Sequence, residues 1–161
     1  MNMTHYMELL ATNQPWNLLR FMVIPVVFAE TLVAIEFLIV YYRKTSGALK
    51  TTSKILSVSA AVYFTLAVFL PLIFTALPGI KWRTPVDFIA VWSYLLGVIP
   101  FIVMALIDLG LVAKNKSADE KMKLHFVWLT VFLVVAHIAM IFGMINPEIV
   151  RGATSTPMMM K

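Results

Sequence analysis

The sequence contains no cysteine among its 161 residues. Disulfides, iron–sulfur clusters, thiolate metal sites and thiol catalysis are therefore excluded. Glycine is scarce as well, with six residues, and no glycine-rich phosphate-binding loop is present. Charged residues make up only 13% of the chain, whereas a soluble domain carries about 25%. This deficit indicates that most of the chain faces lipid or other apolar helices.

Long apolar segments make up most of the sequence, which is 61% hydrophobic with a mean hydropathy of +0.88. Four segments can each cross about 30 Å of hydrocarbon, and they lie at roughly 21–42, 55–77, 87–113 and 124–146. No alternation of period two supports a barrel, so the spans should be helices. Short connections favour antiparallel neighbours. The predicted fold is one all-α domain over residues 1–161, a polytopic integral membrane protein built as a four-helix antiparallel bundle.

Basic residues predict the orientation. Eight Lys and Arg residues lie in the first and third loops, against five on the other side. This bias places both termini outside, and the small, simple chain favours a bacterial cytoplasmic (inner) membrane. Residues 1–20 form an outer amphipathic segment with a short interfacial helix, which Thr4 caps and Pro15 ends. Residues 147–161 form an outer tail.

The net charge of +5 fits basic loops that meet anionic lipid, and it predicts no nucleic-acid partner. The expected partners are the lipid bilayer and either further copies of the chain or a larger membrane complex. Pro25, Pro71 and Pro100 fall inside predicted spans. Each removes a helical donor, frees a carbonyl one turn back and can bend its helix.

Ionisable residues inside the spans are the main indication of function. At a rise of 1.5 Å per residue, Glu30 and His137 each lie about 13 Å from the outer ends of spans one and four. Glu36 and Asp108 lie about 8–9 Å from the inner ends of spans one and three, and His125 lies near the same edge. We therefore expect an outer pair, Glu30 with His137, and an inner cluster of the other three.

Each layer has structural and functional interpretations. The outer pair can hydrogen-bond across two helices, handle a proton or bind a metal. The inner acids can pair with basic residues at the membrane edge, namely Lys114, Lys121 or Arg43. Alternatively, the inner cluster and Glu30 can form a proton or ion pathway.

Methionine placement favours a soft metal at the outer site. Nine of the eleven methionines fall on the predicted outer side. Met140 and Met144 follow His137 by three and seven residues and share its helix face. Thioether and imidazole ligands suit Cu(I). The predicted ligand set is His137, Met140, Met144, Glu30 and His5.

The leading functional prediction is a small, non-enzymatic membrane protein that binds copper or another redox cofactor in the outer half of the bundle, as a subunit of a larger complex. One alternative is a small proton- or ion-coupled transporter. A b-type haem subunit is another, although both span histidines, His125 and His137, lie on one helix. The last is a purely structural subunit. No hydrolytic motif or di-metal carboxylate pattern is present.

Overall fold

The computed structural model describes residues 4–43 and 47–146, which form helices joined by loops and contain no strand. After a short first helix, α1 (His5–Ala11), the chain makes four passes that are long and apolar enough to span a membrane. Pass one comprises α2 (Trp16–Leu18), the π-helical turn η1 (Leu19–Val23) and α3 (Ile24–Tyr42). Pass two comprises α4 (Ala48–Tyr63), the π-helical turns η2 (Phe64–Phe69) and η3 (Leu72–Ala76), and the 3-10 turn η4 (Leu77–Gly79). Pass three comprises α5 (Pro85–Leu96) and α6 (Val98–Asp108), and pass four is α7 (Ala118–Met144).

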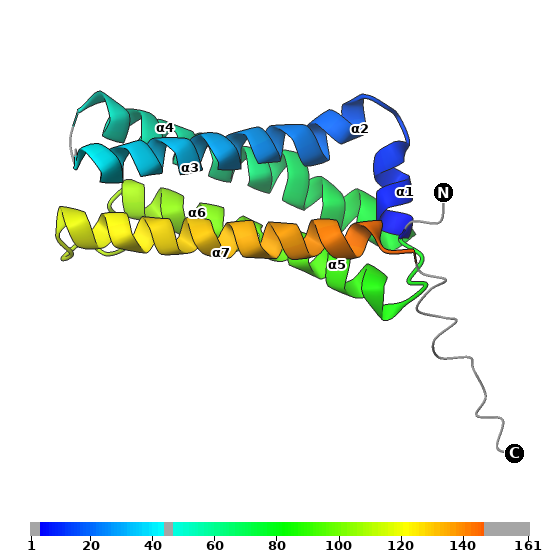
Figure 1. Ribbon diagram of the computed structural model, residues 1–161. Coiled ribbons are helices and arrows are strands. Elements are labelled where there is room, and N and C mark those ends of the chain that lie inside the picture. Colours follow the sequence, from blue (N-terminus) through cyan, green and yellow to red (C-terminus); the bar gives the residue numbers. More distant parts are fainter. Residues whose placement is uncertain (1–3, 44–46, 147–161) are drawn as a thin grey trace, which may run out of the picture.

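The four passes run side by side in an antiparallel bundle (Figure 1). This arrangement confirms the predicted all-α, four-helix integral membrane fold. The end of the bundle that carries α1 is called here the α1 end, and the opposite end the basic end.

The helix bounds differ from the predicted ones at the basic end. The fourth pass begins six residues early, at Ala118, because Ser117 forms a capping box. The Ser117 hydroxyl accepts from the amide of Glu120, and the Glu120 carboxylate accepts from the Ser117 amide at 2.8 Å. The third pass stops at Asp108, five residues before the predicted end, and Gly110 follows with a φ of +74°. Asp108 therefore lies at the end of its helix instead of one turn inside it.

Two span prolines leave carbonyls that other passes satisfy. Pro25 cannot donate to the carbonyl of Phe21, and the hydroxyl of Tyr94 donates to that carbonyl instead. Pro71 likewise leaves the carbonyl of Ala67 free, and Arg20 donates to it through Nε at 2.5 Å. Both passes are π-helical beside the proline. The predicted freed carbonyls thus become links between passes one, two and three.

The core of the bundle contains three phenylalanines. Phe101 is fully buried, and its ring centroid lies 4.3 Å from that of Phe132 and 5.2 Å from that of Phe64. Gly97 lets Phe132 approach, because a Cβ at this glycine would lie 3.3 Å from the Phe132 ring. The aromatic cluster joins passes two, three and four.

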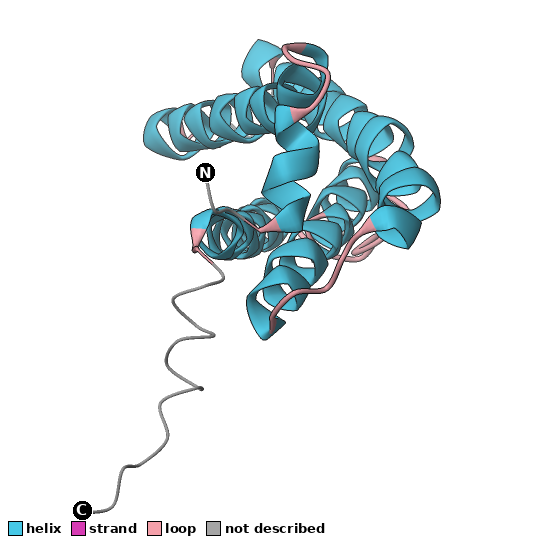
Figure 2. Ribbon diagram, turned by 90° about the vertical axis from the view of Figure 1, so that its right-hand side faces the viewer, coloured by secondary structure: helices cyan, strands magenta, loops and turns pink. Residues whose placement is uncertain are grey.

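Helix α1 lies across its end of the bundle and does not continue the direction of the passes, as the view along the bundle shows (Figure 2). Its buried face, Tyr6 and Leu10, packs with apolar residues of passes two and three. Thr4 precedes this helix as predicted, but its hydroxyl donates to the carbonyl of Gly143 at 2.7 Å and makes no capping bond. The absence of a side chain at Gly143 leaves room for Met7, whose Cγ would lie 3.2 Å from a Cβ there. The N-terminal helix is therefore docked onto the bundle.

A surface ion pair fastens α1 to the loop before α5. Nη1 and Nη2 of Arg83 donate to the two carboxylate oxygens of Glu8, at 2.9 and 2.8 Å. This pair holds the pKa of the Glu8 carboxyl below its ordinary value. A depressed pKa means that the pair stabilises docking above the ordinary pKa and is lost as pH falls through the lowered one. We expect the α1 amides to exchange hydrogen faster in acid than at neutral pH, by a small factor because the pair is exposed. In Arg83→Gln they should already exchange faster at neutral pH and depend less on pH; equal exchange in both proteins would contradict this role.

Candidate functional site

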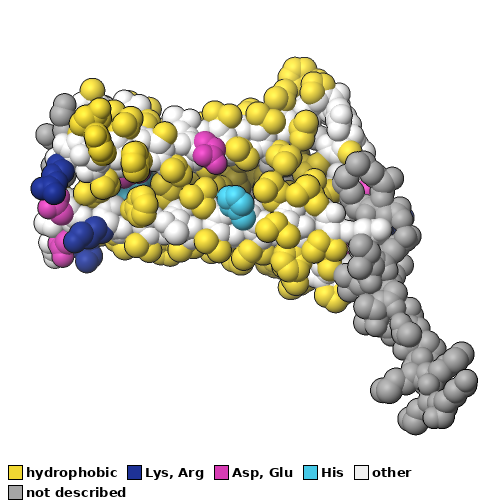
Figure 3. Space-filling view, in the orientation of Figure 1, with side chains coloured by type: hydrophobic (Ala, Val, Ile, Leu, Met, Phe, Trp, Pro, Cys, Tyr) yellow, Lys and Arg dark blue, Asp and Glu magenta, His cyan; other side chains and the backbone are white. Residues whose placement is uncertain are grey.

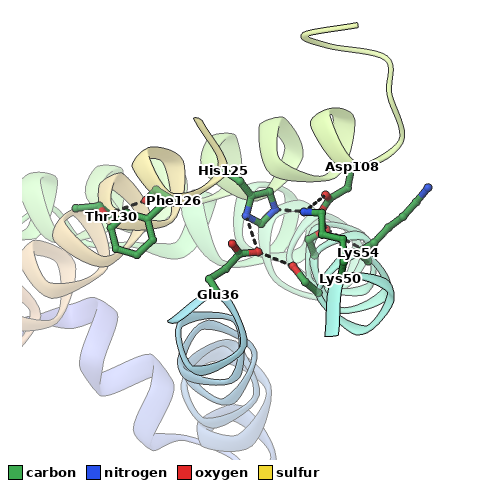
Figure 4. Close-up of polar contacts among 9 residues, drawn as sticks. Glu36, Lys50, Lys54, Asp108, His125, Phe126 and Thr130 are labelled. Atoms are coloured by element: carbon green, nitrogen blue, oxygen red, sulfur yellow. Dashed lines mark hydrogen bonds and ion pairs between the residues drawn. The ribbon is translucent and has the colours of Figure 1, made fainter. Parts of the chain in front are cut away.

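A buried histidine lies between two carboxylates near the basic end (Figure 4). His125 on α7 places Nε2 3.0 Å from Oδ2 of Asp108 on α6, within hydrogen-bond distance. Its other ring nitrogen, Nδ1, lies 3.2 Å from Oε1 of Glu36 on α3. We call these three residues the acid–histidine cluster. They were expected to share one layer, and the structure brings their side chains into contact.

Helix α4 supplies the remaining partners of the cluster. Ser53 donates to Oε1 of Glu36, and Ser57 donates to Oδ2 of Asp108, each at 2.5 Å. The ammonium of Lys50 lies 3.3 Å from Oδ1 of Asp108. One polar layer therefore ties together all four spanning passes.

Burial makes this layer energetically demanding. The side chains of Glu36 and His125 have no exposed surface, and that of Asp108 is 3% exposed. Oε2 of Glu36 and Nδ1 of His125 make no hydrogen bond with the described residues. Buried polar atoms without a partner are costly, so these two neighbouring atoms require an explanation.

The basic partner differs from the predicted ones. Lys114, Lys121 and Arg43 were the expected partners of the inner acids, whereas Lys50 occupies that place. The sequence did contain a signal, because Lys50, Ser53 and Ser57 follow the i, i+3, i+7 spacing of one helix face. A lysine at the start of a helix can reach back to an acid at the end of its neighbour.

Asp108 borders a hollow at the basic end. The hollow has a volume of about 760 Å³ and is lined in part by Lys50, Lys54 and Lys121, together with Ser59 of α4. In Figure 4 the side chain of Lys54 points away from the cluster. The acid–histidine cluster is thus closed toward the middle of the bundle and adjoins an open, basic space on one side.

A second cavity, of about 210 Å³, lies in the half of the bundle nearer the α1 end. Figure 1 shows α3 rising away from α7 toward this end. In Figure 3 an acidic side chain and a histidine face each other across a hollow in an otherwise apolar surface. Glu30 of α3 and His137 of α7 are both exposed and both line the cavity. The structure therefore brings the predicted outer pair to one cavity without a hydrogen bond between them.

The tautomer of His137 follows from the one hydrogen bond of its ring. Nδ1 lies 2.7 Å from the carbonyl of Leu133, and a carbonyl can only accept, so Nδ1 carries hydrogen. In the neutral ring, Nε2 is then a bare nitrogen that can bind a ligand or a metal. The two histidines of α7 differ in burial, because His125 is fully buried whereas His137 is exposed.

Three methionines line the same cavity as Glu30 and His137. Met7 comes from α1, Met22 from η1 and Met140 from α7. Their side chains thus line one space from three separate elements. Apolar residues make up most of the remaining wall, which also includes Tyr94 and Ser93.

Two residues of the predicted metal set lie elsewhere. Met144 is 52% exposed and does not line the cavity. The Nδ1 of His5 accepts from the amide of Lys81, in the loop before α5, at 3.2 Å. The His5 amide donates to Asp87 in the first turn of α5. Asp87, which was not among the predicted site residues, is fully buried and caps α5 together with Thr84. The T-P-x-D spacing of a capping box was its signal.

A site of hard ligands is not formed within residues 4–43 and 47–146. No group of three or more His, Asp or Glu side chains there is placed to hold a metal ion. Of the two sites, only the cavity near the α1 end combines a bare imidazole nitrogen with thioether sulfurs. Soft ligands of this kind select metals such as Cu(I).

Comparison with known proteins identifies a family whose function is unknown. No curated protein matches the chain, and no solved structure matches it. A family model described as a family of unknown function matches residues 1–159 and so covers all four passes, the acid–histidine cluster and the cavity. Because the match extends over nearly the whole sequence, this chain belongs to the family of unknown function DUF6803.

Proposed function

We propose that this protein binds Cu(I) in the cavity between α3 and α7 and serves as a non-enzymatic metal-binding subunit of the membrane. One observation carries the proposal: Met7, Met22 and Met140 line one cavity with His137, whose Nε2 is bare. Thioether and imidazole ligands together favour Cu(I) over harder divalent ions. In the proposed orientation, the α1 end and this cavity face the outside of a bacterial inner membrane.

The side chains and size of the cavity suit an ion better than a large cofactor. Methionine is unbranched and flexible, so three such side chains can close onto a small ion. A volume of about 210 Å³ lies below the roughly 300–1,000 Å³ of drug-sized ligand pockets. Haem is therefore the weaker candidate. Glu30 adds one negative charge beside the site, which would offset the charge of a monovalent cation in an apolar wall.

The test is a Cu(I) titration of the purified chain in detergent, against a coloured Cu(I) chelator and with metal analysis. Wild-type protein should hold about one Cu(I) per chain. His137→Ala should lose it. Met140→Leu should weaken binding by at least about tenfold, since even groups behind metal ligands contribute 10–100-fold.

A matched control lies one helical turn away from Met140. Met144 is on the same helix and even more exposed, but it does not line the cavity, so Met144→Leu should bind as wild type does. Folded wild-type protein without copper would overturn the proposal, as would equal loss from Met140→Leu and Met144→Leu. A Soret band in the purified protein would favour haem instead.

A further inference from the structure

We propose that the acid–histidine cluster is a proton-loading site, which exchanges one proton between the hollow at the basic end and the buried carboxyl of Glu36. This inference is independent of the copper proposal, because the cluster and the cavity near the α1 end share no residue. It rests on three features: the hydrogen count, the charge count and the position of Asp108 at the edge of the hollow.

A count of the hydrogens in the cluster leaves one hydrogen-bond contact, between His125 and Glu36, without a hydrogen. A neutral imidazole has a single N–H, and in the tautomer that loading leaves, the contact of Nε2 with Asp108 at 3.0 Å uses it. Nδ1 of His125 and Oε2 of Glu36 then have no hydrogen between them or from any other described residue. A small rotation of the Glu36 carboxyl would align it with Nδ1, 3.2 Å from Oε1. One added proton, on Nδ1 of His125 or on Oε2 of Glu36, gives both atoms a hydrogen-bond partner.

The charge count requires the same proton. Two ionised carboxylates, Lys50 and a neutral His125 carry a net charge of −1 in a layer where three side chains are buried. An added proton makes the layer neutral, which lowers the cost of burying it. The ionisable groups near the cluster are Glu36 on α3, Lys50 and Lys54 on α4, Asp108 on α6 and Lys121 on α7, and the lysines line the hollow.

The route from the hollow follows from the contacts. A proton from water in the hollow binds a carboxylate oxygen of Asp108, forming an O–H bond. Before loading, the single N–H of His125 is on Nδ1, 3.2 Å from Oε1 of Glu36, so Nε2 is bare. Nε2 takes the proton as the O–H bond of Asp108 breaks, and the ring becomes an imidazolium with hydrogen on both nitrogens. The Nδ1–H bond breaks in turn as a Glu36 oxygen takes its hydrogen. Unloading runs through the same bonds in reverse, which restores the original tautomer.

Infrared difference spectroscopy on the full chain reconstituted in lipid can test this route. Carbon-13 labelling of glutamate identifies the C=O stretch of protonated glutamic acid as it changes with bulk pH and exchanges with D₂O. This band should lose a component in Glu36→Gln. In Asp108→Asn the Glu36 component should exchange with D₂O at least about tenfold more slowly, because the first proton acceptor is missing.

Two serines of α4 provide a matched pair for the same measurement. Ser57 is buried and donates to Asp108, whereas Ser59 is exposed in the hollow. Ser57→Ala should change the exchange rate, and Ser59→Ala should not. Exchange of Glu36 at the wild-type rate in Asp108→Asn would overturn the proposed route.

A nitrogen-15 spectrum of protein with an intact acid–histidine cluster tests the proposal even if the cluster variants do not fold. The chain has three histidines, so His5→Gln and His137→Gln assign the nitrogen-15 signals of His125 by elimination. At neutral pH either both ring nitrogens of His125 should carry hydrogen or Glu36 should be protonated. A neutral His125 ring beside an ionised Glu36 would refute the proton-loading site.

Discussion

Replacing His125 with leucine should lower the free energy of unfolding by about 3–5 kcal/mol, the cost of removing one partner from a buried ion pair. The variant leaves Glu36 and Asp108 buried without the group that lies between them. Ser53, Ser57 and Lys50 cannot replace it, because each already donates to one of the two acids. Reversible unfolding by SDS titration from mild detergent, followed by circular dichroism, measures the loss.

The control for this prediction is the other histidine of α7. His137 is exposed, and the one hydrogen bond of its ring is to a carbonyl of its own helix, so His137→Leu should change stability by less than about 0.5 kcal/mol. Replacing Glu36, Asp108 and His125 together by leucine should recover most of the loss, since no buried charge is then unpaired. Equal stability of the His125→Leu and His137→Leu proteins would show that the cluster does not hold the passes together.

Phe101→Ala should have the second-largest effect, a loss of about 2–4 kcal/mol. The ring is fully buried between Phe64 and Phe132, and its removal leaves a cavity that costs about 24 cal/mol per Å³. Soluble proteins lose about 3–5 kcal/mol on such a change. The loss should be somewhat smaller here, because helices in lipid gain packing but little from the hydrophobic effect.

Phe74 provides the comparison on the lipid side. Its side chain is 75% exposed on pass two, so Phe74→Ala exchanges a lipid contact for another lipid contact and should leave stability nearly unchanged. The same SDS titration compares the two variants. A Phe74→Ala loss as large as that of Phe101→Ala would contradict the assignment of the core.

The tertiary structure alone decided the partners of the intramembrane charges. The rise per residue placed Glu30 and Glu36, and likewise His125 and His137, at different depths without showing which of them would be buried. Lys50 was absent from the expected partners because its contact with Asp108 joins helices far apart in the sequence. The carbonyls freed by Pro25 and Pro71 could be foreseen, but their donors, Tyr94 and Arg20, could not. Such pairings depend on how each helix is rotated and displaced against its neighbours.

The amino-acid sequence by itself determined the membrane class, the four passes and the two depths of the ionisable residues. Those properties depend on local composition and on a fixed rise per residue, so they need no knowledge of packing. The docking of α1 and the divergence of α3 from α7 determine which methionines share the cavity with His137. Met144 and His5 belonged to the predicted ligand set but do not line the cavity. Helical spacing determines which side of its own helix a residue occupies, and only the packing of the helices determines which residues that side contacts.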